Sequence, residues 1–268
     1  MTVRGACRPG GTPPGQDRWA ATERSVIVLD GASAFDPEAA PADAYVDALL
    51  AALVDRIDST EPLPAVLGWA IEQATEKVSA EPGTGPSSTV AIVRHANEGI
   101  EVAVLGDSTI VVGLADGRID RITDDRMSRV AHSEREQYRR QLQTGAGYDE
   151  HHRATLQAIQ AAERAARNQG AGYWIAETDP AAADHVLISR YPHRAVEWSV
   201  LATDGAQRGI DFHGISWPDL PARTTEELQA MLDELHRWEA QDDPTGARLP
   251  RAKRHDDKTL VTWTPAQA

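Results

Sequence analysis

The chain has 268 residues, with 41 Asp or Glu against 27 Lys or Arg, and therefore a formal net charge of -14 at pH 7. A surface of this sign repels phosphate backbones and anionic headgroups, so nucleic acid and membrane surfaces are not expected partners. The only cysteine is Cys7, which excludes an intrachain disulfide and a four-thiolate zinc site. No apolar stretch could span a bilayer or form a signal peptide, so we expect a cytoplasmic protein.

The first part of the chain predicts one buried strand followed by two helices. The length suits a single domain over residues 1–268. Residues 25–30, SVIVLD, form a β-branched run that ends in an Asp-Gly pair, which predicts a strand with Asp30 at its carboxyl end. Residues 41–57 and 62–79 place apolar side chains at helical spacing, which predicts two helices that each pack one face against a sheet.

The rest of the chain predicts more strands, with helices between them. Short strand patterns separated by turn signals fill residues 87–123, which favours an antiparallel meander over repeated βαβ units. Residues 127–167 are charged and favour helix. A strand follows near residues 196–202, then a helix that Thr224 or Thr225 caps, then a last strand in KTLVTW. This order suggests two sheets covered by helices.

Acidic residues stand at strand ends in four separate stretches of the sequence. They are GQDRW with Asp17, VIVLDGAS with Asp30, VLATDGAQ with Asp204, and RHDDKTLVTW with Asp256 and Asp257. Each alone is more often a turn or a cap. Together they predict one shared site, because Mg²⁺ and Mn²⁺ prefer carboxylate, carbonyl and water oxygens and need few protein ligands.

These motifs, with the GDS turn at residues 106–108 between them, resemble the metal-dependent protein phosphatases of type 2C from about Gln16 to Trp263. The stretches VLDGAS, ITDDRM, GYWIAE and RHDDKT are similar to a divergent actinobacterial branch of that family. The resemblance implies an α+β fold, a four-layer αββα sandwich of two antiparallel sheets flanked by helices. Residues 127–192 would then be a divergent helical or flap insertion.

The same resemblance implies an activity and a set of ligands. The activity is hydrolysis of phosphoserine and phosphothreonine in proteins or small phosphoesters, by a dinuclear Mn²⁺ or Mg²⁺ centre with a bridging water as nucleophile. Asp30 would bridge both ions, and the Gly31 carbonyl would bind one of them. Asp204 and Asp256 would complete the other ion, and these three aspartates are the expected catalytic residues.

Two further positions follow from the resemblance with weaker matches. Asp17, beside Gln16, stands where the family has its first acidic pair. Asp125 in ITDDRM falls where some members hold a weak third ion. Asp107, in the GDS turn, matches a residue that is structural in the family.

The chain departs from the family pattern at three places. The arginine that grips the substrate phosphate would lie in GTPPG; the possible substitutes are Arg4, Arg8 and Arg18. Ala32 follows Asp30-Gly31 where some members have a histidine, so a water, His255 or His132 would have to protonate the leaving group. Gln16 replaces an acid.

Two other readings stay open at the level of sequence. The departures favour a pseudophosphatase that binds a partner or phosphoprotein without turnover, whereas the intact aspartates favour an enzyme. A more distant alternative is an amide hydrolase whose nucleophile is Cys7, unmasked by removal of the preceding residues.

Overall fold

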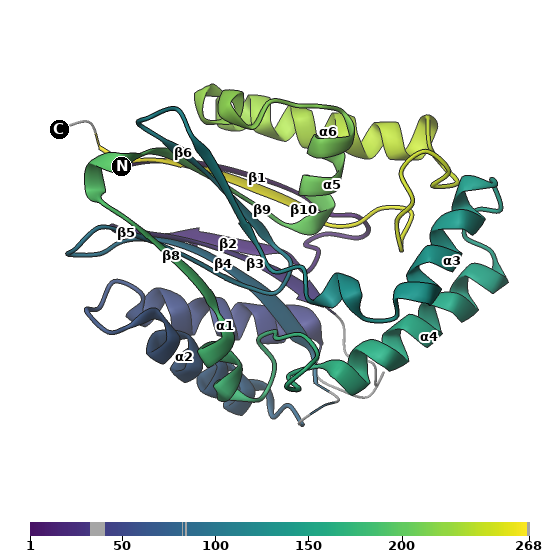
Figure 1. The fold of residues 1–268 in the computed structure, drawn as a ribbon, viewed down its shortest axis with the longest axis horizontal. Helices are drawn as coiled ribbons and strands as arrows, with labels where there is room; N and C mark the ends of the chain where they lie inside the picture. Colours follow the sequence, from purple (N-terminus) through teal and green to yellow (C-terminus); the bar gives the residue numbers. More distant parts are fainter. Residues whose placement is uncertain (33–40, 82, 84, 267–268) are drawn as a thin grey trace.

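Two antiparallel sheets face each other between layers of helices in the computed structural model, which describes residues 1–32, 41–81, 83 and 85–266 (Figure 1). Sheet A has the strand order β1 (Thr2–Arg8), β10 (Lys258–Thr264), β9 (Val196–Ala202), β6 (Thr109–Leu114), β7 (Ile119–Thr123). Sheet B has the order β2 (Arg18–Ala21), β3 (Ser25–Ala32), β4 (Ser87–His95), β5 (Ile100–Leu105), β8 (Leu187–Tyr191). The predicted α+β sandwich is confirmed.

The helices cover the outer faces of the sheets. Sheet B carries α1 (Ala42–Arg56) and α2 (Leu63–Val78), and sheet A carries α5 (Asp204–Phe212) and α6 (Thr225–Gln241) (Figure 1). The predicted helices at 41–57, 62–79 and after Thr224 are confirmed. Thr224 caps α6 with a capping box, because its hydroxyl accepts from the Glu227 N–H while the Glu227 carboxylate accepts from the Thr224 N–H.

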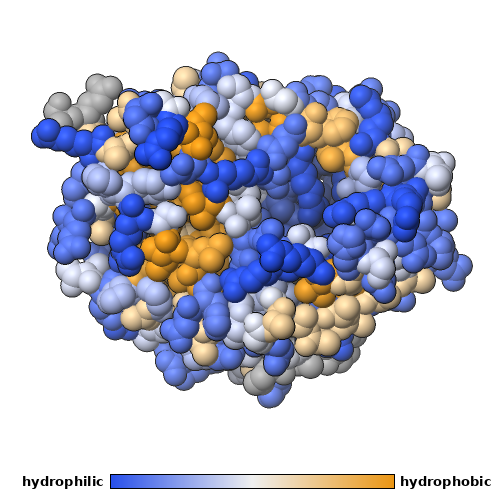
Figure 2. All heavy atoms as spheres, viewed as in Figure 1, coloured by the Kyte–Doolittle hydropathy of each residue, from blue (hydrophilic) through white to orange (hydrophobic). Residues whose placement is uncertain are grey.

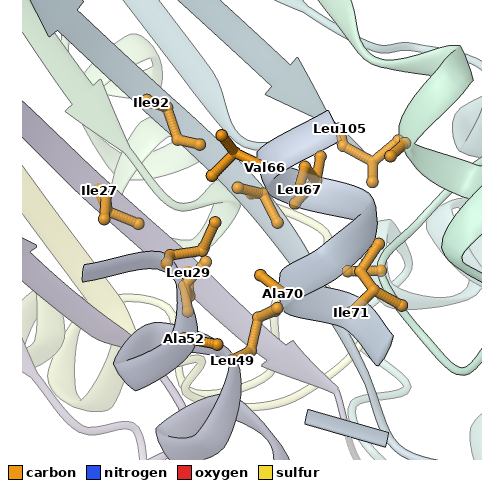
Figure 3. Packing of buried hydrophobic residues seen from close by; sticks show 14 of the residues in the cluster. Ile27, Leu29, Leu49, Ala52, Val66, Leu67, Ala70, Ile71, Ile92 and Leu105 are labelled. Atoms are coloured by element: carbon orange, nitrogen blue, oxygen red, sulfur yellow. The ribbon is translucent and has the colours of Figure 1, made fainter. Parts of the chain in front are cut away.

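The burial of β3 on both faces explains why its sequence is a continuous run of apolar residues. Side chains alternate between the two faces of a strand, and here both faces are buried. Ile27 and Leu29 pack against α1 and α2 (Figure 3). Val26 and Val28 point the other way, into the layer between the two sheets. Packing on both faces therefore fixes the position of β3, and with it the position of Asp30 near the end of the strand.

Trp263 of β10 is wholly buried and packs in the layer between the two sheets. Strand β1 lies beside β10, with Cys7 opposite Thr259 and Gly5 opposite Val261. The sequence does not predict β1, because a Gly/Pro-rich start masks it. Cys7 is half-buried near the end of this paired strand, and the residues before it are paired with β10, which does not suit a nucleophile exposed by their removal.

The predicted meander is wrong at one connection. Strands β4 and β5 form a hairpin in sheet B, and β6 and β7 form a hairpin in sheet A. The turn between β5 and β6 crosses from one sheet to the other. Gly106 has φ +85°, and a Cβ there would lie 2.9 Å from the Thr89 side chain, so this crossing requires a glycine.

The remaining helices, α3 (His132–Gln143) and α4 (Glu150–Ala166), form a hairpin beside one end of the sandwich (Figure 1). They lie within residues 127–192, the segment expected to be an insertion; β8, at its end, pairs with β5. Short 3-10 turns are Met127–Arg129, Pro180–His185, His193–Ala195 and Trp217–Ala222. No helix among the described residues has the length and apolar character needed to cross a membrane.

We expect Trp263→Ala to lower the free energy of unfolding by about 3–5 kcal/mol, because it empties a large volume between two sheets that cannot collapse onto it. Denaturant unfolding followed by circular dichroism measures the loss. The control is Val54→Ala on α1, where the side chain is 41% exposed and the change should stay within about 0.5 kcal/mol. Equal losses in the two variants would contradict this packing.

Candidate metal centre

Four aspartates from separate elements meet at one end of the sandwich. Asp17 precedes β2, Asp30 lies near the end of β3, Asp204 is the first residue of α5, and Asp256 stands just before β10. Loss of hydration, followed by the negative charges of Asp17, Asp204 and Asp256, raises the pKa of Asp30 well above its ordinary value. The structure thus brings together the four aspartates that the sequence indicates. Figure 2 shows a hydrophilic hollow on this face of the molecule, beside the α3–α4 hairpin.

Asp17 is the most buried member of the group, with 7% of its surface exposed. Its Oδ2 accepts a hydrogen bond of 2.9 Å from the hydroxyl of Thr203. Thr203 follows β9 of sheet A, whereas Asp17 precedes β2 of sheet B. Its Oδ1 is buried and has no hydrogen-bond partner among the described residues. Burial, then the charge of Asp257, raises the pKa of Asp17 to about 8.

Asp107 extends the cluster in a way that sequence alone did not assign. It sits in the sheet-crossing turn, and burial, then the charge of Asp204, raises its pKa to about 7. Beside it, the Ser108 and Thr89 hydroxyls hydrogen-bond at 2.6 Å. The turn is therefore structural, as the sequence suggested, and it also adds a negative charge to the site.

Two cations face these carboxylates. Arg208 forms an ion pair with Asp204 one helical turn away on α5. The Lys253 ammonium lies 3.1 Å from Asp256 Oδ1. Burial acts to raise the pKa of Asp256, but Lys253 and Arg208 outweigh it and hold this pKa below its ordinary value. Sequence reasoning missed both residues, although the four-residue spacing of Asp204 and Arg208 on a helix is a usable signal.

Asp257 has a different role from Asp256. Its Oδ1 accepts a hydrogen bond of 2.7 Å from the Gly10 N–H, and its Oδ2 accepts from the Gln16 N–H. It therefore anchors the N-terminal loop that leads to Asp17. The charge of Asp256 acts on Asp30, which supports the choice of Asp256 over Asp257 as a ligand.

Two glycines of the Asp-Gly pairs are required by close packing. A Cβ on Gly31 would lie 2.6 Å from the Gln16 carbonyl oxygen. A Cβ on Gly205 would lie 2.1 Å from the Asp257 carbonyl oxygen. Asp204-Gly205 is therefore the start of α5 and not the turn that such a pair usually forms. A bare Cα lets the helix end approach the Asp256–Asp257 backbone.

The donor set fits hard divalent cations. It consists of carboxylates that are held close together against their repulsion, and one of them carries a buried oxygen with no partner. Such oxygens are the preferred ligands of Mg²⁺ and Mn²⁺. The residues that could hold ions are Asp17, Asp30, Gly31 through its carbonyl, Asp204 and Asp256.

A second cluster lies next to this one, formed by His236 and Glu239 of α6 with His255. Among the described residues it is the group whose three ligand atoms lie within 4.8 Å of one another; no three of the described aspartates lie that close. Lys258, wholly buried, donates to Glu239 Oε2 at 2.8 Å, and His255 Nδ1 lies 3.0 Å from the same oxygen. The Lys258 ammonium thus already supplies the positive charge in this cluster.

Several residues weighed from the sequence lie elsewhere. The structure does not bring Asp125 to the four aspartates: its side chain is 62% exposed and pairs with Arg129 at 2.6 Å. Its assignment to a third ion stays a prediction that requires this pair to open. Arg4 donates to the Pro221 carbonyl, Arg8 pairs with Asp233, and Arg18 pairs with Asp47.

Comparisons with known proteins agree with this fold. A model of the family described as Protein phosphatase 2C matches residues 5–252. Among solved structures, the Mycobacterium tuberculosis serine/threonine phosphatase PstP matches with a TM-score of 0.54 at 18% identity, covering 98% of each chain. Stp1 from Staphylococcus aureus matches with a TM-score of 0.55 at 12% identity, covering 99% of this chain and 95% of that one.

A third structure, the catalytic domain of PstP in complex with 2 manganese ions, matches with a TM-score of 0.50 at 18% identity, covering 97% of this chain and 96% of that one. At such identities these likenesses concern the fold alone. A sequence search of curated proteins finds no match.

We expect Gly205→Ala to disrupt the site, because the new methyl group would overlap the Asp257 carbonyl and push α5 away from Asp256. The free energy of unfolding should fall by about 1–3 kcal/mol, and the Mn²⁺ affinity measured by calorimetry should fall with it. Gly11→Ala is the matched control, since a Cβ there meets no atom within 4 Å. Unchanged Mn²⁺ affinity in Gly205→Ala would show that this contact does not position the ligands.

We also expect the metal-free protein to lose stability as the pH rises from about 4 to about 8. The carboxyl groups of Asp17 and Asp107 bind protons more tightly in the folded chain than in the unfolded one. Their stabilisation is complete below the ordinary pKa and is lost as the pH passes about 7 and 8, at about 1.4 kcal/mol per pH unit for each group.

Thermal melts in chelator at several pH values measure this effect. Asp17→Asn should flatten the slope, because the amide resembles the protonated acid. Saturating Mn²⁺ should also remove the slope, because the ions stabilise the ionised carboxylates. A melting temperature that rises with pH in chelator would contradict the crowding of these groups.

Proposed function

Because the chain belongs to the protein phosphatase 2C family, a family of metal-dependent protein serine/threonine phosphatases, we propose that it hydrolyses phosphoserine and phosphothreonine esters at the carboxylate cluster. The observation that carries the proposal is the convergence of Asp17, Asp30, Asp204 and Asp256 from elements on both sheets. The expected partners are phosphorylated proteins. Small phosphoesters are expected to serve as test substrates.

Asp30 would hold both ions, since it feels the charge of every other member of the cluster. Gly31 would add its carbonyl, and Asp17, Asp204 and Asp256 would complete the two shells. A pair of Mn²⁺ or Mg²⁺ ions supplies, when bound, a nucleophilic water at neutral pH and charge neutralisation for the phosphoryl group. The fold that the chain shares with PstP, solved with 2 manganese ions, supports a pair.

The other residues of the site orient these ligands. Thr203 fixes one oxygen of Asp17, which leaves the other free for an ion. Asp257 holds the loop of residues 10–16 against the cluster. His255 lines the same cavity as Asp256, whereas His132 is exposed at the start of α3. This supports His255, of these two histidines, as the proposed proton donor to the leaving oxygen.

We expect Asp30→Ala to abolish Mn²⁺-dependent hydrolysis of p-nitrophenyl phosphate and of a phosphothreonine peptide. The variant should stay folded and melt at the same or a higher temperature in chelator, because it removes one of several repelling charges. The stabilisation by Mn²⁺, about 2.7 kcal/mol for the wild type at a hundredfold excess over the dissociation constant, should be lost, and with it the rise in melting temperature.

Asp116→Ala is the matched control, since Asp116 is exposed and pairs with Arg118 in the turn between β6 and β7. It should keep both turnover and the metal response. Undiminished turnover in Asp30→Ala would overturn the proposal. A wild type that binds Mn²⁺ and phosphopeptide without any turnover would identify a pseudophosphatase instead.

A further inference from the structure

Lysine is rare in this chain and is concentrated at the site. Of the 27 Lys and Arg residues only three are lysines, Lys77, Lys253 and Lys258, and two of them bracket the Asp256–Asp257 pair. Lys258 is wholly buried and bound to Glu239. The Lys253 side chain is 62% exposed and forms an ion pair with Asp256. Of the two lysines at the site, Lys253 is therefore the one whose side chain can change partner.

Lys253 faces a cavity of 440 Å³ next to the cluster. The cavity is lined on one side by the glycine-rich loop and on the other by the basic loop: Gly10, Gly11, Thr12, Gly15, Gln16, Lys253, Arg254, His255, Asp256 and Asp257. An anion in this cavity would contact the ammonium directly, and Asp256 lies in the same wall. A phosphoryl group bound here would thus lie beside a carboxylate of the cluster.

The cations on the other elements do not line this cavity. Arg208 lies one turn from Asp204 on the same helix, so the helix itself maintains that pair. The N-terminal arginines bond to Pro221, Asp233 and Asp47, as described above. Lysine has a compact charge on a flexible stem, which suits a change of partner better than the planar fork of arginine.

The ammonium of Lys253 contacts Asp256 and also lies within the field of Asp30 and Asp204. A lysine is charged at neutral pH, so it competes with any other cation for Asp256. A divalent ion held by Asp256 would displace this ammonium, which would then lack its counter-charge and could contact an anion in the cavity.

We propose that Lys253 is the phosphate-binding residue of this chain: it neutralises Asp256 in the metal-free protein and transfers its hydrogen bonds to the phosphoryl oxygens of the substrate once an ion holds Asp256. This inference rests on the proposed function for the identity of the substrate. It assigns the anion contact to the basic loop before β10 and not to the N-terminal segment.

Lys253→Met tests the proposal because its two effects have opposite signs. Mn²⁺ should bind several-fold more tightly, since a competing cation is gone. Inorganic phosphate, titrated into the Mn²⁺-loaded protein by calorimetry, should bind about tenfold more weakly, and KM for p-nitrophenyl phosphate should rise by a similar factor. Lys253→Arg should restore phosphate binding. Lys77→Met, which removes an exposed lysine of α2 that does not line the cavity, should change neither affinity.

A purely structural role for Lys253 would weaken Mn²⁺ and phosphate binding together, and that result would overturn the proposal. Unchanged phosphate affinity in Lys253→Met would overturn it as well. These outcomes are separate from failure of the proposed function: a wild type that binds Mn²⁺ and phosphate but hydrolyses no ester still reports on Lys253 through the two affinities.

Discussion

Repulsion between carboxylates at one end of the sandwich determines how the surrounding chain is built. Asp17, Asp30, Asp204 and Asp256 come from four elements, and no single sheet could supply them all. Burial, together with the charges of the neighbouring carboxylates, raises the pKa values of Asp17 and Asp30, so the fold holds these groups together at a cost in free energy when they are ionised. Both sheets must therefore be complete and packed before the cluster exists, since the apolar layer between them is what holds the strand ends in place.

Buried ion pairs set the path of the loop that carries Asp256. Arg251 and Asp243 are almost wholly buried and pair at 2.7 Å, and the Asp243 carboxylate also accepts from two backbone N–H groups. Lys258 binds Glu239 and, at 3.0 Å, the carbonyl oxygen of Asp256. Such pairs add little net stability, because desolvation offsets their attraction. These pairs instead fix the conformation of the loop, because any conformation that breaks either pair leaves a buried charge without its partner.

The sequence predicts the parts of this fold that depend on local pattern. Strand β3, helices α1, α2 and α6, and the last strand follow from periodicity and capping residues, and the order of the acidic motifs predicts their convergence. The start of α5 was not predictable in the same way, because Asp204-Gly205 reads as a turn until the Asp257 backbone is placed against Gly205. The sheet crossing at Gly106 also depends on a contact with Thr89, which no local pattern contains.

Residue roles that depend on long-range pairing were the hardest to predict. Asp125 and Asp204 are both aspartates in polar motifs, yet one is exposed beside Arg129 and the other is part of the cluster. Lys253 belongs to a basic run that resembles an ordinary solvated loop. Only the position of that loop, fixed by Arg251 and Asp257, turns one of its charges toward the carboxylates.

The α3–α4 hairpin contacts this same loop from the other side. His152, buried on α4, donates from Nε2 to the Ala252 carbonyl oxygen at 3.0 Å, one residue before Lys253. The hairpin's own apolar cluster is small: Tyr138, Leu142 and Ile159. A unit with few buried contacts opens at a lower free energy than the sandwich to which it is attached. Opening of the hairpin would break the contact beside Lys253 and leave both sheets intact. The position of Lys253 therefore depends on the hairpin, whereas the positions of the carboxylates depend on the packing of the two sheets.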